Sequence, residues 1–323
     1  MSGSGPAVTP RPRAPRRAAL VAATVCTTLL LAACSTSTPV TSLAAGASAG
    51  GRPITVVATI NAWGSIAAQL GGTRVQVTSI ITNPATDPHA YEPTPTDARV
   101  VAGAGVFIEN GIGYDSWGAK MLAANPVGGR SVLDVGKLVG IADGGNPHRW
   151  YSPTDVRAVV NQITAEYAKT DPGDKGYFEQ RKSAFFTTDL ATYNDLISQI
   201  RAKYTGVKVG ASESIFSPLA QALGLDLVTP ASFLKAISQG TDVSAADKAT
   251  IDAQISSKQI KVYVFNSQNS TPDVAAQVAA AKAAAIPVVA VTETLSPAGA
   301  TFQQWQSAQL QRLAAALHEA IGR

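Results

Sequence analysis

Four polar side chains that can bind a metal cation follow predicted β-strands in this chain of 323 residues. His89 follows the second predicted strand, and His148 follows the fourth. Glu213 and Glu293 follow the first and last predicted strands of the second half. Imidazole nitrogens and carboxylate oxygens are donors that divalent first-row cations accept. The four residues therefore form a candidate metal site, provided that the fold brings them together.

The two histidines share a local context that favours a fixed side-chain direction. Asp87-Pro88 precedes one and Asn146-Pro147 precedes the other, and proline restricts the backbone ahead of each imidazole. Each candidate also has an ordinary structural interpretation. A histidine in a proline-rich turn is often a surface residue, and a glutamate can interact with the N-terminus of a following helix or lie solvated in a loop. Composition alone does not decide between these interpretations.

One uninterrupted amphipathic stretch, residues 177–205, separates the two halves of the chain. It contains no Gly or Pro. Its apolar residues recur close to the helical period: Phe178, Phe185, Tyr193, Leu196, Ile200 and Tyr204. Asp174 is the expected N-cap, and Gly206 follows the expected end. The pattern predicts one rigid helix, about 40 Å long, that joins two lobes.

Both halves alternate between strand and helix patterns, which is typical of parallel sheets with helical crossovers. The strands expected in the first half are Ile54–Ala58, Val75–Ile81, Val106–Glu109 and Ser131–Val135. Those expected in the second half are Val207–Ala211, Asp226–Val228, Val262–Asn266 and Pro287–Thr292. The predicted fold class is α/β, with two lobes that each contain a parallel sheet flanked by helices. In such sheets ligands bind beyond the carboxyl ends of the strands, where the four candidates lie.

The chain divides into five predicted segments. Residues 1–33 combine a basic start, an apolar run and small residues before Cys34, which is the layout of a signal peptide. Residues 34–51 are rich in Ser, Thr, Gly and Ala and form a flexible tether. The N-terminal lobe is expected over 52–172, the linking helix over 173–205 and the C-terminal lobe over 206–323.

Charge and cysteine content limit the range of functions. Of the 26 basic residues, four arginines precede Cys34, so 22 remain after processing against 22 acidic residues. A nearly neutral chain argues against a nucleic-acid partner, which would need a basic stripe. Cys26 falls in the predicted signal peptide, which leaves one cysteine and no disulfide framework.

Several motifs, taken in order, resemble a known family. The most specific is D-P-H-x-Y-E-P at 87–93; the others are Asn110-Gly111, Gly113-Tyr114-Asp115-Ser116-Trp117, Asn146-Pro147-His148, Glu213 with Phe216, and Thr292-Glu293-Thr294-Leu295. Over about residues 52–321 the chain resembles the metal-binding substrate-binding lipoproteins of bacterial ABC importers for zinc and manganese. The resemblance implies two parallel α/β lobes joined by one long rigid helix, with a metal between them.

The same resemblance implies a ligand set. His89 and His148 would come from the first lobe, and Glu213 and Glu293 from the second. Many family members carry a third histidine where this chain has Glu213, and an aspartate where it has Glu293. Zinc-specialised members often carry a histidine-rich acidic loop, which this chain lacks. These departures make manganese as reasonable a substrate as zinc, because carboxylate oxygens suit harder cations.

A metal-bound imidazole usually donates its second N–H to an acceptor, and Glu92 and Asp115 are candidates for that role. The sequence Leu31-Ala32-Ala33-Cys34 resembles a lipobox, which implies cleavage before Cys34 and lipidation of that residue. The implied protein is a monomeric receptor, anchored on the outer face of the cytoplasmic membrane, that delivers a divalent metal to an ABC permease.

Two other functions remain open at this point. An extracytoplasmic metalloenzyme such as a hydrolase could use the same donors, but no H-E-x-x-H motif is present. Four protein ligands would also leave no open position on a tetrahedral metal, as catalytic zinc requires. An adhesin on the same scaffold is the second alternative, and no sequence feature argues for or against it.

Overall fold

The computed structural model describes residues 52–83 and 91–322. The predicted signal peptide, the tether, Cys34 and His89 lie outside the described residues. In the described residues no helix combines the length and the apolar character that crossing a membrane requires.

The first lobe contains a parallel four-stranded sheet in the order β2-β1-β3-β4. Its strands are β1 (Ile54–Ile60), β2 (Val75–Ile81), β3 (Val106–Glu109) and β4 (Ser131–Asp134). Its helices are α1 (Asn61–Gly71), α2 (Pro95–Ala102), α3 (Ser116–Ala124), α4 (Val135–Val139) and α5 (Pro153–Thr170).

Successive side chains along these strands point to opposite faces of the sheet, so the core of the first lobe has two layers. Val57 and Phe107 pack with Val101 of α2 on one face. Val56 and Ile108 belong to the larger cluster on the other face, which includes residues of α1 and α5. Both faces are therefore covered, which is the usual condition for a purely parallel sheet.

The second lobe repeats this scheme in the order β6-β5-β7-β8. Its strands are β5 (Lys208–Ala211), β6 (Asp226–Leu227), β7 (Val262–Asn266) and β8 (Val288–Val291). Its helices are α8 (Ser217–Leu223), α9 (Ala231–Ser238), α10 (Ala245–Ser256), α11 (Pro272–Ala283) and α12 (Phe302–Ile321). Tyr263 packs with α9, α10 and α11, whereas Val262 and Val264 face α8 and α12.

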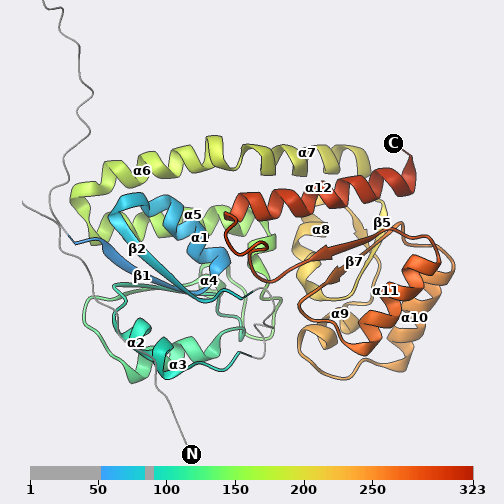
Figure 1. Ribbon diagram of the computed structural model, residues 1–323, viewed down its shortest axis with the longest axis horizontal. Coiled ribbons are helices and arrows are strands. Elements are labelled where there is room, and N and C mark those ends of the chain that lie inside the picture. Colours follow the sequence, from blue (N-terminus) through green and yellow to red (C-terminus); the bar gives the residue numbers. More distant parts are fainter. Residues whose placement is uncertain (1–51, 84–90, 323) are drawn as a thin grey trace, which may run out of the picture. The chain divides into compact units, whose positions relative to one another are not determined.

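The linking segment has the predicted position but a more complex geometry. It consists of α6 (Lys175–Ala184), a π-helical turn (Phe185–Asp189) and α7 (Ala191–Tyr204) (Figure 1). The turn closes with the Leu190 N–H donating to the Phe185 carbonyl at 2.9 Å. A single π-helical turn adds only one residue, and the apolar spacing across it stays close to the helical period, so the sequence pattern does not reveal it.

The start of the linking segment differs from the prediction, whereas its end agrees with it. Asp174 makes no side-chain cap bond, and its carboxylate instead forms an ion pair with Arg74 at 2.6 Å. Gly206 lies just beyond the helix with a φ of +79°, as expected of a terminating glycine. The π-helical turn aside, the prediction of a long helical connection is confirmed.

Two of the helices in the described residues, α4 and α9, were not predicted from the sequence. The helix α4 follows β4 directly, with Asp134 capping it at the Lys137 N–H. His148 consequently lies beyond α4, rather than at the end of the strand. The helix α9 lies between β6 and α10, in a stretch too short for its period to be recognised.

Hydrogen bonds connect the two lobes near the site. The Leu295 N–H donates to the Asn61 side-chain oxygen at 3.2 Å, and the Tyr151 hydroxyl donates to the Thr292 carbonyl at 2.9 Å. The helix α12 packs on α7 and also contacts α1 of the first lobe. The segment after β8 is thus fixed by both lobes.

Candidate metal site

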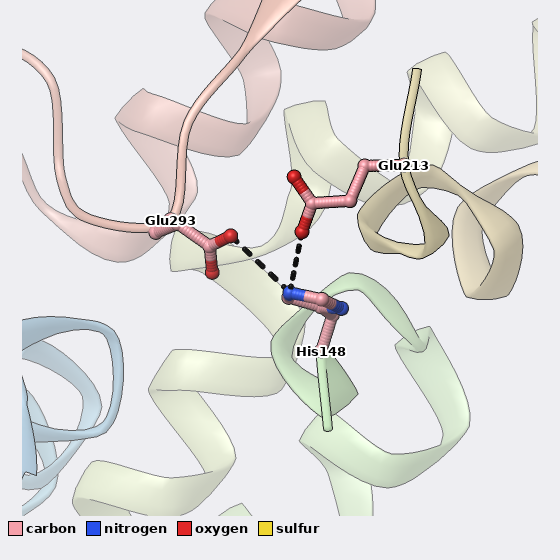
Figure 2. Close-up of side chains that lie close together, drawn as sticks. All are labelled: His148, Glu213 and Glu293. Carbon is pink, nitrogen blue, oxygen red and sulfur yellow. Dashed lines mark hydrogen bonds and ion pairs between the residues drawn. The ribbon is translucent and has the colours of Figure 1, made fainter. Parts of the chain in front are cut away.

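Three of the predicted donor residues converge between the two lobes (Figure 2). One donor atom from each of His148, Glu213 and Glu293 lies within 4.8 Å of the others. The His148 Nε2 atom lies 3.2 Å from Glu293 Oε1 and 3.4 Å from Glu213 Oε1. All three side chains are completely buried. The fourth predicted ligand, His89, lies outside the described residues, so its place in the site stays a prediction.

The orientation of the His148 ring is set by Asn146. The Asn146 side-chain oxygen lies 2.8 Å from His148 Nδ1 and also accepts the His148 backbone N–H at 3.1 Å. The Asn146 amide donates to the Ser214 carbonyl in the other lobe at 2.7 Å. The oxygen of Asn146 can only accept, so this contact matches the tautomer with the ring proton on Nδ1. In that tautomer the Nε2 lone pair faces the two carboxylates, as metal binding requires.

The two candidate acceptors named from the sequence do not bond to His148. The Asp115 carboxylate accepts the backbone N–H groups of Asn110 and Gly111, at 2.7 and 2.8 Å. Glu92 is exposed, and its predicted relation to His89 lies outside the described residues. Asp115 acts instead on the loop that follows β3.

The two glutamates come from the carboxyl edge of the second sheet. Glu213 follows β5, and Glu293 follows β8. Asn266, the last residue of β7, donates from Nδ2 to Glu213 Oε2 at 2.8 Å and to Glu293 Oε1 at 2.7 Å. Ser238 donates its hydroxyl to Glu213 Oε1 at 3.0 Å. One amide at the end of β7 thus holds the carboxylates that follow the strands on either side of it, β5 and β8.

Tyr114 reaches across from the first lobe and donates its hydroxyl to Glu293 Oε2 at 3.2 Å. Burial, reinforced by the Glu293 and Asp115 carboxylates, raises the pKa of Tyr114 well above its ordinary value. The phenol therefore stays protonated and acts as a donor.

The turn that delivers Tyr114 has an unusual backbone. Gly111, Ile112 and Gly113 have φ values of +70°, +62° and +82°. A positive φ is strained for a β-branched residue such as isoleucine. Ile112 is nonetheless buried, and Asp115 binds the N–H groups at the start of the turn.

Aromatic rings enclose the imidazole on the side of the first lobe. The Trp150 ring lies edge-on to His148 and to Tyr114, each at a centroid distance of 5.4 Å. Trp63 packs on Trp150 and donates its indole N–H to Asn110 at 3.0 Å. These contacts keep water away from the donors and strengthen electrostatic interactions at the site.

The donor set fits a divalent cation as a bound substrate. Two carboxylates carry two negative charges into a buried site, and a divalent cation would compensate both. Imidazole nitrogen suits zinc and other borderline cations, whereas carboxylate oxygen suits harder ones such as manganese. The predicted convergence of His148, Glu213 and Glu293 is thus observed, and their role as metal ligands stays a prediction.

Sequence analysis missed two residues of this site and left two without a role. Asn266 ends a buried strand with a polar side chain, the same signal that identified the other candidates, and could have been found. Ser238 gave no such signal, since it lies in the unpredicted helix α9. Tyr114 and Asn146 were noted within motifs, but spacing does not show which atoms their side chains contact.

Two parallel α/β lobes, a long helical connection and a buried group of metal donors between the lobes define a two-lobed binding protein. Residues 56–316 match the model of the family described as "Zinc-uptake complex component A periplasmic". The chain belongs to this family of metal-binding substrate-binding proteins of ABC importers. The family resemblance inferred from the motifs is confirmed.

Two curated relatives show how far the sequence similarity extends. The manganese-binding lipoprotein MntA of Halalkalibacterium halodurans is 26% identical over 193 residues, which is 57% of this chain and 62% of that protein. The high-affinity zinc uptake system protein ZnuA of Bacillus subtilis is 26% identical over 260 residues, which is 73% of this chain and 77% of that protein. The match to the first relative thus spans less than two thirds of its length.

Solved structures confirm the fold. A periplasmic metal-binding protein from Candidatus Liberibacter asiaticus has a TM-score of 0.66 at 19% identity, covering 82% of this chain and 99% of that chain. The binding protein FpvC of Pseudomonas aeruginosa, solved with Mn²⁺, has a TM-score of 0.68 at 19% identity, covering 83% and 100%. The predicted fold class, two parallel α/β lobes joined by a helical segment, is therefore correct.

Proposed function

We propose that this protein captures a divalent transition-metal cation, zinc or manganese, and delivers it to the membrane permease of an ABC importer. The cation binds between the lobes, to His148, Glu213 and Glu293, together with His89. The observation that carries this proposal is the convergence of one imidazole and two carboxylates, all fully buried, with their donor atoms within 4.8 Å.

Burial is the physical reason to assign these donors to a cation. Two carboxylates out of contact with water are costly unless positive charge or donors compensate them. Asn266, Tyr114 and Ser238 each supply neutral hydrogen bonds to the carboxylates. These neutral donors offset part of the free-energy cost of burying the carboxylates, and a divalent cation would compensate their negative charge.

The choice between zinc and manganese depends on more than affinity. Relatives of similar identity are named for each metal. Affinity of a mixed nitrogen and oxygen site follows the Irving–Williams order, so zinc binds more tightly than manganese in vitro. Selection in the cell then rests on geometry and on which metal is available.

The location of the receptor is part of the same proposal. The protein is a monomer held on the outer face of the cytoplasmic membrane by lipid on Cys34. The support is the lipobox-like sequence before Cys34 and the word lipoprotein in the names of several relatives. A receptor placed there would meet the cation before the permease does.

The test is metal binding by matched pairs of variants. We expect His89→Ala and Glu213→Ala each to weaken Zn²⁺ and Mn²⁺ binding at least tenfold by calorimetry. The exposed His318 and Glu319 on α12 provide the controls His318→Ala and Glu319→Ala, which should bind like the wild type. Unchanged affinity in Glu213→Ala would remove the second lobe from the site.

Native mass spectrometry of the protein purified from its own host gives stoichiometry and metal identity. We expect one transition-metal ion per chain. Stoichiometric uptake without turnover of ester, amide or phosphoester substrates would favour the receptor over a metallohydrolase. A protein isolated without any metal, and unable to take up Zn²⁺ or Mn²⁺ after chelator treatment, would contradict the proposal.

A further inference from the structure

The candidate donors have no direct contact with solvent. His148, Glu213 and Glu293 each have 0% exposure. A hydrated cation can reach them only after part of the surrounding protein moves.

An open cavity of about 630 Å³ lies directly beside the site. Tyr114 and Asn146 line it from the first lobe, and Ser214, Leu234 and Ser238 line it from the second. Four of these residues also bond to the donors. Tyr114 donates to Glu293, and Ser238 donates to Glu213. The Asn146 side-chain oxygen and the Ser214 hydroxyl lie 2.8 and 3.4 Å from His148 Nδ1. The cavity and the metal site thus share a wall one side chain thick.

Two serine hydroxyls belong to this wall. The hydroxyl oxygens of Ser214 and Ser238 are 2.6 Å apart, and Ser238 also donates to Glu213 Oε1. That carboxylate oxygen is the one that faces His148 Nε2 at 3.4 Å. A serine hydroxyl reorients by rotation about one bond, whereas Tyr114 is packed edge-on against two rings.

The element that carries Ser238 ends at the surface. Ser238 is the last residue of α9, and Gly240, two positions later, has a φ of +63°. Residues 239–242 are exposed. The rest of α9 is held more firmly, because Phe233 and Ile237 pack in the core of the second lobe. Rotation of the Ser238 side chain, together with movement of the exposed residues 239–242 that follow it, would open the wall.

From this geometry, and resting on the proposed function, we propose that the cation enters and leaves the site through this cavity, with Ser238 as its gate. The Ser238 side chain lies between the cavity and Glu213 Oε1, and it must turn aside for the cation to pass. Ser238 therefore sets the rates of loading and release, and acts as a positioning residue for Glu213.

Filling the cavity tests the route without disturbing the core. Ala231 is exposed at the start of α9 and lines the cavity. Ala231→Trp should slow both association and chelator-driven dissociation of Zn²⁺ or Mn²⁺ about tenfold, with a nearly unchanged dissociation constant. Ala249→Trp, at an exposed position on α10 away from the cavity, is the matched control and should leave both rates unchanged.

Removing the Ser238 hydroxyl should have the opposite effect on the two rates. Ser238→Ala should accelerate association and dissociation together. A residue that only holds Glu213 in place would change dissociation alone, so a faster association rate distinguishes a gate from a purely structural role.

The charge of the cavity lining provides an independent test of the entry route. Lys235 is the one charged side chain among the described residues that line the cavity. Lys235→Glu should speed association about threefold at low salt, and the gain should shrink at high salt because ions screen the interaction. Lys203→Glu makes the same charge change at an exposed position on α7 and should have a much smaller effect.

The measured rates and affinities distinguish failure of the entry route from failure of the proposed function. Wild-type protein that binds Zn²⁺ or Mn²⁺, with unchanged rates in Ala231→Trp and Ser238→Ala, would overturn the route and leave the proposed function standing. Wild-type protein that binds neither cation would overturn the proposed function itself.

Discussion

The side-chain oxygen of Asn146 lies 2.8 Å from Nδ1 of His148, and this contact determines which ring nitrogen faces Glu213 and Glu293. Asn146 also bonds to the Ser214 carbonyl, so the residue that orients the imidazole joins the two lobes. A neutral amide can hold the tautomer without adding a further charge to the buried site.

The first prediction follows from this contact. Asn146→Ala removes the acceptor 2.8 Å from Nδ1 and leaves the more distant Ser214 hydroxyl, at 3.4 Å, to orient the ring. We therefore expect a tenfold to hundredfold loss of Zn²⁺ affinity, the usual effect of removing such a partner. Asn146→Asp keeps an acceptor at the same place and should bind within a few fold of the wild type. Calorimetry on chelator-treated protein provides the measurement. Equal losses in the two variants would show that the amide donor, rather than the acceptor, matters.

The second prediction concerns Asn266, whose amide serves two carboxylates. Asn266→Leu should lower the free energy of unfolding of the metal-free protein by about 1–3 kcal/mol, the cost of a lost donor to buried acceptors. The loss should be smaller when Zn²⁺ is bound, because the cation neutralises the same oxygens. Urea unfolding with and without metal measures both values.

A neighbouring amide supplies the control for Asn266. Asn269 donates to the Ile237 backbone carbonyl at 3.1 Å, a neutral contact that no metal would compensate. Asn269→Leu should therefore lose the same stability in both states. If Asn266→Leu behaves in the same way, its amide does not act through the carboxylates.

The third prediction concerns Glu109, the buried last residue of β3. Burial, with the nearby Asp115 and Asp134 carboxylates, raises the pKa of Glu109 to about 7. The folded protein therefore takes up this proton at a higher pH than the unfolded chain does. The contribution of Glu109 to stability increases as the pH falls from about 7 towards its ordinary value near 4.5.

The test compares Glu109→Gln with the wild type across this pH range. The variant should be more stable than the wild type at pH 8, by about 1–3 kcal/mol, and the difference should vanish near pH 5. Metal-free protein is used for both, so that changes at the candidate metal site cancel. Glu319→Gln, at an exposed position, should show no such trend. Parallel stability curves for Glu109→Gln and the wild type would rule out a buried acid with a raised pKa.

The sequence predicts the lobes well because strand patterns, helix periods and turn residues are local signals. The β7 strand, for example, has the predicted bounds of Val262–Asn266. The π-helical turn at Phe185–Asp189 was missed because it adds one residue to a long periodic stretch, and α9 was missed because it is too short for its period to be recognised. At the site, the residue types of His148, Glu213 and Glu293 and their positions after predicted strands identified them as candidate donors. Which groups orient those donors depends on contacts between segments distant in the sequence.

The fourth prediction concerns anchoring and falls on Cys34, which lies outside the described residues. Replacing Cys34 by Ala should release the protein from membranes, because acyl chains supply the binding energy of a lipid anchor. Fractionation followed by immunoblotting measures the change. A variant that remains on membranes after washing with high salt would disprove lipid anchoring through Cys34.

The last prediction concerns metal, stability and pH together. A ligand that binds only the folded state raises stability by about 4 kcal/mol when its concentration is a thousand times its dissociation constant. We therefore expect Zn²⁺ and Mn²⁺ both to raise the melting temperature of the metal-free chain at pH 7.5, with the larger shift for Zn²⁺. Ligation requires an unprotonated imidazole, and a protonated His148 would itself pair with Glu213 and Glu293 in place of the cation. The metal-induced shift should therefore shrink at pH 5. No shift with either metal at pH 7.5 would contradict the metal-receptor assignment, and a Zn²⁺ shift undiminished at pH 5 would exclude histidine from the ligands.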